Sequence, residues 1–180
     1  MEQLEQIIKT LSLTMGAAWA SGINLYATLL MLGFLGLTDN IVLPQSLEIL
    51  MNPMVMGAAG LMYFVEFFAD KVPGVDSGWD TIHTFVRIPA GVLLAAGAVG
   101  DVNPALVLSA AIVGGGLAAG SHLTKSGTRL LINASPEPVS NWTASILEDI
   151  AVIAGVWAAL THPVIFLVFL AVFICLALWL

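Results

Sequence analysis

A stretch without any charged residue runs from Thr10 to Thr38, and it exceeds the roughly 20 mostly apolar residues that a bilayer-crossing helix needs. The whole chain has the same character, because 59% of its 180 residues are hydrophobic and 9% are charged. Soluble domains contain about a quarter charged residues. A water-soluble domain of this size could not cover its surface with so few charges. The sequence therefore predicts an integral membrane protein whose single domain covers residues 1–180.

The charge balance and the cysteine count exclude several classes of protein. Five Lys and Arg residues stand against twelve Asp and Glu, which excludes a nucleic-acid partner, and the high apolar share excludes disorder. Cys175 is the one cysteine, so neither a disulfide framework nor a cysteine-based zinc site can form. The motifs Ser-x-x-Lys, Gly-x-Ser-x-Gly, His-Glu-x-x-His and the Walker loop do not occur. We expect no cofactor, and an enzyme is the less favoured class.

Six apolar segments are expected to form an all-α bundle of transmembrane helices. A proline stands at or just before the start of the second, fourth and sixth segments, where the first helical turn tolerates its missing N–H. The first segment contains Ser21-Gly22-Ile23-Asn24, whose small and polar residues permit a break in the helix. The expected spans lie near residues 10–37, 54–70, 80–100, 104–122, 142–160 and 163–180.

Two pairs of spans share sequence features. Asn52-Pro53 opens the second span and Asn103-Pro104 opens the fourth, and the spans that follow them contain Gly91-Val92 and Gly155-Val156. These features suggest an internal two-helix repeat whose copies have the same orientation in the membrane. Chance similarity is the alternative.

The positive charges predict how the bundle is oriented. With six spans, the N-terminus and the loops after the second and fourth spans share one side, which then contains Lys9, Lys71, Lys125 and Arg129. Loops that contain Lys and Arg stay in the cytoplasm. We therefore expect both termini on the cytoplasmic side, with Arg87 inside the third span.

Charged residues inside the expected spans suggest a functional site. A charge in the apolar zone is costly unless it is paired or hydrated, so these groups should face inward and meet each other. Excess carboxylates in such a cluster could hold a proton or a cation. No recognised metal-ligand spacing occurs, which leaves the metal question open, and an ion-pair network that only fixes helix packing is the alternative. The expected site residues are Glu66, Asp70, Asp76, Asp80, His83, Arg87, Glu148 and Asp149, joined by Ser21 and Asn24 if the first helix breaks.

A second set of polar residues is expected in the loop after the fourth span. His122, Lys125 and Arg129 have the i, i+3, i+7 spacing of one helix face. A cationic face at the cytoplasmic interface could hold a phosphate, a lipid headgroup or an anionic substrate. An ordinary positive-inside anchor is the alternative.

Several long motifs of polar and small residues run through the chain. They are Ser21-Gly22-Ile23-Asn24-Leu25-Tyr26, Glu66-x-x-Ala69-Asp70-Lys71-Val72-Pro73-Gly74-Val75-Asp76, Asp80-x-Ile82-His83-Thr84-Phe85-Val86-Arg87-x-Pro89-Ala90-Gly91, His122-x-x-Lys125, Arg129, Asn141 and Ser145-x-x-Glu148-Asp149. Together they resemble the bacterial membrane-protein family catalogued as domain of unknown function 4126. The resemblance covers most of the chain and implies a polytopic protein of the bacterial inner membrane, but it names no activity.

The sequence thus favours a small inner-membrane transporter or channel with a polar, carboxylate-rich site near the cytoplasmic face, for a cation or a proton-coupled solute. One alternative is a lipid- or phosphate-headgroup-binding protein or enzyme that acts through His122, Lys125 and Arg129 together with Arg87. A structural membrane subunit is the other. The expected partner is the lipid bilayer, and self-association into a homo-oligomer is left open.

Overall fold

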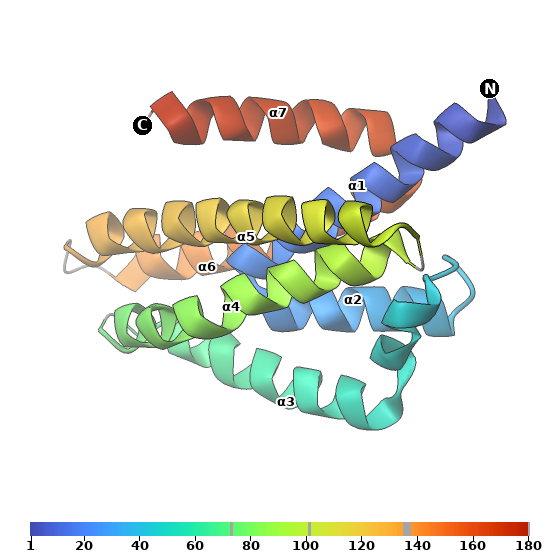
Figure 1. Ribbon diagram of the computed structural model, residues 1–180. Coiled ribbons are helices and arrows are strands. Elements are labelled where there is room, and N and C mark those ends of the chain that lie inside the picture. Colours follow the sequence, from blue (N-terminus) through green and yellow to red (C-terminus); the bar gives the residue numbers. More distant parts are fainter. Residues whose placement is uncertain (73, 101, 135–137, 180) are drawn as a thin grey trace.

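The computed structural model describes residues 1–72, 74–100, 102–134 and 138–179, and it confirms the predicted all-α class (Figure 1). Within these ranges no residue lies in a strand. The expected end of the sixth span at Leu180, Pro73 of the second motif and Asp101 lie outside the described residues, as do residues 135–137. The helices are α1 (Glu2–Ile23), α2 (Leu25–Leu37), the 3-10 helix η1 (Gln45–Met51), α3 (Pro53–Ala69), α4 (Val75–Val99), α5 (Pro104–Asn133), α6 (Pro138–Thr161) and α7 (Pro163–Trp179).

Asparagine and proline begin α3 and α5 in the same way. The Asn52 side chain accepts a hydrogen bond from the backbone N–H of Met54, and Asn103 accepts one from Ala105. Each asparagine satisfies one of the free N–H groups at its helix start, and the proline that follows has no N–H to satisfy. The expected helix starts at these two positions are confirmed.

The first apolar segment is broken at Asn24. This residue is extended, with φ −144° and ψ 100°, and it separates α1 from α2. Its side-chain oxygen accepts a hydrogen bond from the N–H of Ala27 and thereby caps α2. The break that the sequence permitted is therefore present, and an asparagine stabilises it.

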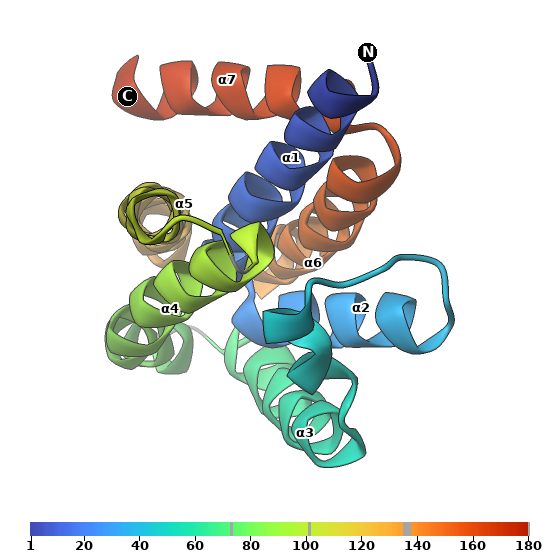
Figure 2. The ribbon, with the colours of Figure 1, turned by 45° about the vertical axis from the view of Figure 1, so that its right-hand side comes forward.

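The chain reverses at this break, so that α1 and α2 form a hairpin. Ser12 of α1 donates a hydrogen bond to the carbonyl of Ala159, near the end of α6, whereas Asn24 reaches Asp149, which lies ten residues earlier in α6. Helix α2 then runs back toward η1, where its Gly36 lies against Met51. The first segment, which the sequence left open as one span or a broken helix, is thus a hairpin, and both of its ends lie at one end of the bundle (Figures 1 and 2).

Among the described residues, three helices are long and apolar enough to cross a membrane, which indicates a membrane protein with fewer clear spans than the six expected. They are α4, α5 and residues 139–161 of α6. Helix α3 joins them only when it is counted together with η1, from which it is bent by 66°. Helices α2 and α7 are shorter apolar helices. Three expected spans are therefore missing from this set: the first apolar segment is divided between α1 and α2, and α3 and α7 have only 17 residues each.

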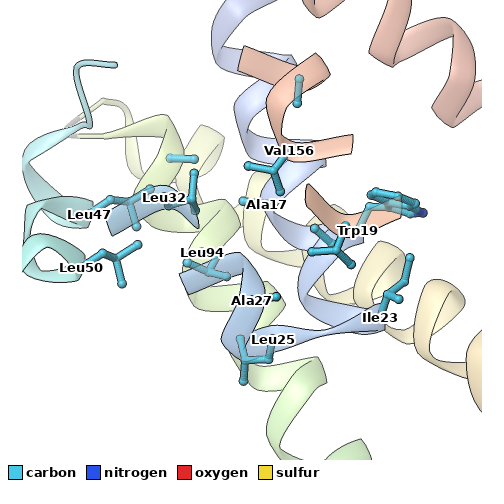
Figure 3. Packing of buried hydrophobic residues seen from close by; sticks show 14 of the residues in the cluster. Ala17, Trp19, Ile23, Leu25, Ala27, Leu32, Leu47, Leu50, Leu94 and Val156 are labelled. Atoms are coloured by element: carbon cyan, nitrogen blue, oxygen red, sulfur yellow. The ribbon is translucent and has the colours of Figure 1, made fainter. Parts of the chain in front are cut away.

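The apolar core lies between the hairpin and the helices around it. Figure 3 shows Trp19 and Ala17 of α1 beside Val156 of α6, with Leu32 of α2 near Leu47 of η1. Edge-to-face ring pairs also join Trp19 to α7, with ring centroids 5.3 to 6.0 Å apart. This core is separate from the charged residues and fixes the hairpin between α4, α5 and α6.

Small residues allow α4 and α5 to cross closely. A side chain on Gly114 would overlap Ala95, and one on Gly91 would overlap Ala118. Gly116, by contrast, has no neighbour within 4 Å of the place that a side chain would occupy. The close crossing brings the polar faces of the two helices together farther along the bundle.

Candidate functional site

Charged side chains from α3, α4, α5 and α6 meet at the end of the bundle where α3 ends and α4 begins (Figure 1). Nearly all of them are buried, and only Glu148 retains noticeable exposure, with 18% of its side chain accessible. We refer to this group as the charged cluster. Its members are Glu66, Asp70, Lys71, Asp76, Asp80, Arg87, Lys125, Arg129, Glu148 and Asp149.

One face of α4 carries much of the charged cluster. Asp76, Asp80, His83 and Arg87 follow one another at about one-turn intervals and all are buried, whereas Phe85 on another face is exposed. With a rise of about 1.5 Å per residue, Asp76 and Arg87 lie roughly 17 Å apart along the helix. The cluster therefore extends from the end of the bundle deep into it.

The basic residues of α5 lie in a helix and not in the expected loop. Helix α5 continues to Asn133, well past the expected end of the span at His122, because no proline interrupts it. His122, Lys125 and Arg129 are buried along its inner face. The expectation of a basic loop at the interface is wrong, because these side chains point into the charged cluster.

Arg87 links α4 to α3. Its Nη2 lies 2.5 Å from Oε1 of Glu66 and its Nη1 lies 3.0 Å from Oδ1 of Asp80. All three side chains are essentially inaccessible to solvent. A buried carboxylate needs such a partner, since an unpaired charge in a low-dielectric interior is strongly unfavourable.

Lys125 lies among four carboxylates. Its ammonium nitrogen is 2.9 Å from Oδ2 of Asp70, 3.6 Å from Glu148 and 3.7 Å from both Glu66 and Asp80. An ammonium group has three N–H donors. It can therefore bond only some of these carboxylates at one time, and the others interact with it through charge alone.

Arg129 joins α5 to α3 and α6. Its Nη2 lies 2.6 Å from Oε2 of Glu148, and its Nε donates to Oε1 of the same carboxylate at 2.9 Å. Its Nη1 donates to the backbone carbonyls of Asp70 at 3.2 Å and Asn141 at 3.0 Å, and to the Asn141 side chain. The fixed fork of a guanidinium suits such a paired contact with one carboxylate.

The turn of the hairpin reaches the edge of the charged cluster. Nδ2 of Asn24 donates to Oδ1 of Asp149 at 2.9 Å, and the hydroxyl of Tyr63 donates to Oδ2 of the same carboxylate at 3.3 Å. Ser21 is buried but donates to the carbonyl of Ala18 in its own helix. The structure thus brings Asn24 to the charges and leaves Ser21 outside the cluster.

Lys71 follows α3 and supplies a fourth cation to the cluster. Its ammonium donates to the carbonyl of Phe67 at 2.9 Å and to the hydroxyl of Ser145 at 3.3 Å. Burial lowers the pKa of Lys71, and the carboxylates of Asp149 and Asp70 oppose this shift. The basic groups thus number four and the carboxylates six, so the cluster has two more carboxylates than cations.

The two buried histidines have different surroundings. His83 stacks on Trp79 and its ring nitrogens lie 2.9 Å from the Trp79 carbonyl and 3.1 Å from the Tyr26 hydroxyl. Nδ1 of His122 lies 3.0 Å from Nη1 of Arg87, and because arginine can only donate, Nδ1 must be the acceptor. His122 then donates from Nε2 to Thr84 at 2.7 Å, so it is neutral in this arrangement.

Several carboxylate oxygens in the cluster lack a hydrogen-bond donor. Among the described residues, none donates to Oε2 of Glu66, Oδ1 of Asp70, Oδ1 of Asp76 or Oδ2 of Asp80. Native proteins leave few buried polar atoms unsatisfied, and each one calls for an explanation. Three of these residues, Asp70, Asp76 and Asp80, each offer one oxygen within 4.8 Å of the others.

A small polar cavity between α4 and α5 adjoins Asp80. Its volume is about 170 Å³. Its lining residues are Ser77, Asp80, Thr81, Thr84, Ser126 and Leu130. Two larger pockets, of about 940 and 840 Å³, are lined by apolar and uncharged polar residues in the part of the chain that the structure describes. The small cavity therefore reaches the cluster at Asp80, whereas these two larger pockets do not.

The structure brings together most of the residues expected at the two sites. The carboxylates and Arg87 of the first set form ion pairs with Lys125 and Arg129 of the second, so one cluster replaces two sites. Sequence reasoning missed several polar contributors, of which Tyr26, Lys71, Asn141 and Ser145 belong to motifs already quoted for the family resemblance. The full set is Tyr26, Tyr63, Lys71, Asn133, Asn141 and Ser145.

Three long apolar helices and a buried cluster of charges define a helical membrane protein with a polar interior. The model of the family described as Domain of unknown function (DUF4126) matches residues 11–180. The chain therefore belongs to this family, and every residue of the charged cluster lies inside the match. No curated protein and no solved structure matches the chain.

Proposed function

We propose that this protein transports a cation, or a solute coupled to protons, and that the charged cluster is its binding site. The observation that carries the proposal is the imbalance of buried charge, six carboxylates against four cations inside a bundle of apolar helices. Ionisable groups at membrane depth are costly to bury and are characteristic of ion and proton pathways. A net negative site of this kind attracts cations.

The hairpin of α1 and α2 supports the proposal. Its turn at Asn24 contacts Asp149 deep inside the bundle. Transporters often place the ends of interrupted helices beside the bound ion, because the free backbone groups at those ends can interact with it. Helix ends are tolerated at membrane depth only where protein or a polar cavity surrounds them.

We further propose an arrangement in the bacterial inner membrane. Helices α3 to α7 would each cross the bilayer, and the α1–α2 hairpin would enter from one side and return to it. The end of the bundle that bears Lys71, Lys125 and Arg129 would face the cytoplasm, following the positive-inside rule. Pairing of two copies would be one way to complete a pathway in so small a bundle.

The alternatives have less support from the geometry. Lys125 and Arg129 already contact carboxylates, and His122 lies between Arg87 and Thr84. An anionic headgroup would have to displace these partners. A network with a purely structural role would explain the ion pairs but not the surplus of carboxylates. The experiment below therefore tests for this role as well.

Ion flux in vesicles separates transport from a structural role. Wild-type protein and Glu66→Gln would be reconstituted into liposomes that contain a pH-sensitive dye or a dye for divalent cations. We expect Glu66→Gln to reduce the flux of the transported ion at least about tenfold, a change of roughly 1.4 kcal/mol in the governing free energy. The amide keeps the size of the side chain and an oxygen that Arg87 can bond.

The control is Glu48→Gln, which removes an exposed carboxylate outside the cluster and should leave flux unchanged. Thermal unfolding of both variants in detergent shows whether the fold persists. Flux equal to empty vesicles for the wild type, or undiminished flux in a folded Glu66→Gln, would refute transport through the cluster. A change in stability alone would favour the structural role.

A further inference from the structure

Three aspartates of the cluster converge from two helices. Asp70 follows α3, and Asp76 and Asp80 lie one turn apart at the start of α4. One carboxylate oxygen from each lies within 4.8 Å of the others. Their exposed fractions are 3%, 0% and 2%, so water outside the protein does not screen them from one another.

Each of these carboxylates has one oxygen in use and one oxygen free. The used oxygens are Oδ2 of Asp70, which Lys125 contacts at 2.9 Å, and Oδ2 of Asp76, to which Asn133 donates at 2.8 Å. Oδ1 of Asp80 accepts from Arg87 at 3.0 Å. The remaining oxygens, Oδ1 of Asp70, Oδ1 of Asp76 and Oδ2 of Asp80, receive no donor from the described residues.

This division of the oxygens has the form of a metal site with its surrounding shell. In such sites the ligand oxygens bind the ion, and neighbouring donors bond the rest of each ligand and fix its orientation. Three anionic oxygens suit a hard divalent cation such as Mg²⁺, Ca²⁺ or Mn²⁺, which prefers carboxylate and water ligands. An unfilled cluster would instead leave three buried oxygens unsatisfied, at a substantial cost in free energy.

The small polar cavity gives the ion a route and further ligands. It adjoins Asp80, and its lining includes the hydroxyl-bearing residues Ser77, Thr81, Thr84 and Ser126. A cavity of about 170 Å³ can hold a few water molecules. Divalent cations usually retain part of their water shell, so protein ligands on one side and water on the other are a common arrangement.

We propose that Asp70, Asp76 and Asp80 bind a divalent cation that enters through this cavity, and that this ion is the transported cation. Transport of the bound ion rests on the proposed function, whereas the binding site is argued from the geometry alone. Lys125 and Arg129 reduce the net negative charge around the three aspartates, which weakens cation binding and so favours release of the ion.

Binding of Mn²⁺ to detergent-purified protein tests the site. Isothermal titration and the electron paramagnetic resonance signal of free Mn²⁺ would give the affinity and the stoichiometry. We expect wild-type protein to bind Mn²⁺ and Asp76→Asn to bind it at least about tenfold more weakly. Asp76 is the best position to change, because it makes a hydrogen bond to Asn133 but no ion pair that the substitution would break.

Glu48→Gln is the matched control, since it removes an exposed carboxylate of η1, outside the charged cluster, and should bind Mn²⁺ as the wild type does. Equal affinity in Asp76→Asn and wild type would overturn the site, and so would the absence of Mn²⁺ binding in the wild type. Terbium luminescence keeps the test decisive if Asp76→Asn fails to fold. Trp79 lies between the two α4 aspartates in the sequence, so Trp79→Phe should reduce sensitised emission while binding persists.

The two proposals fail in different ways. Mn²⁺ binding without flux of any ion would support the binding site and refute transport. Proton flux that depends on Glu66, together with no Mn²⁺ binding, would support transport and refute the divalent cation site.

Discussion

At the scale of single residues, Arg129 shows how the cluster holds the helices together. Its guanidinium bonds the carboxylate of Glu148 through two nitrogens and also bonds backbone carbonyls of Asp70 and Asn141. We expect Arg129→Ala to lower the free energy of unfolding by about 3–5 kcal/mol, because it leaves buried acceptors without their donor. Arg129→Lys should lose less, since it keeps the charge but not the fork of donors.

Chemical denaturation in detergent micelles measures both changes. Lys9→Ala is the comparison, because Lys9 pairs with Glu5 on an exposed helix face and its loss should leave stability unchanged. Similar stabilities for Arg129→Ala and the wild type would mean that these buried contacts contribute little to the fold.

At the scale of helices, the approach of α1 to α5 depends on Gly22. A side chain at Gly22 would overlap the Ala118 carbonyl and the Ser121 hydroxyl, and the backbone atom cannot move aside easily. We expect Gly22→Ala to destabilise the protein by about 1–3 kcal/mol through overpacking. Gly116→Ala should be neutral or stabilise by about 0.5–1 kcal/mol, because alanine favours a helix and nothing lies near.

Thermal unfolding of the two variants under identical detergent conditions makes the comparison. A Gly22→Ala variant as stable as Gly116→Ala would show that α1 and α5 are not closely packed at this position.

The helices also show which parts of the fold could be predicted from the sequence. The all-α class and the capped starts of α3 and α5 follow from apolar runs and from Asn-Pro pairs, which act locally. The direction of α2 does not follow from the sequence, because Asn24 permits either a kink or a full reversal of the chain. Which of these forms depends on contacts with η1 and with Asp149, which is distant in the sequence. Likewise, the sequence does not show that His122, Lys125 and Arg129 lie on a buried face of α5. This becomes clear only when the structure places carboxylates of α3 and α6 beside them.

At the scale of the whole molecule, the hairpin changes which loops share a side of the membrane. Figure 1 places the N-terminus and the link between α2 and η1 at one end of the bundle and the C-terminus at the other. The two termini thus lie at opposite ends, whereas six spans would have brought them to one side. The N-terminal half of α1, which contains Lys9, accordingly begins at the end of the bundle opposite to the one where α3 ends and α4 begins.

Cysteine labelling in intact cells tests this arrangement. In a Cys175→Ser background, Gln3→Cys and Asn40→Cys should react with a membrane-impermeant maleimide from the same side, and Val75→Cys only from the other. All three positions are exposed in the structure. Labelling of Gln3→Cys and Asn40→Cys from opposite sides would instead mean that the first apolar segment crosses the membrane once. Asn24 could then not approach Asp149 from a returning hairpin, and the polar turn would have to be removed from the proposed pathway.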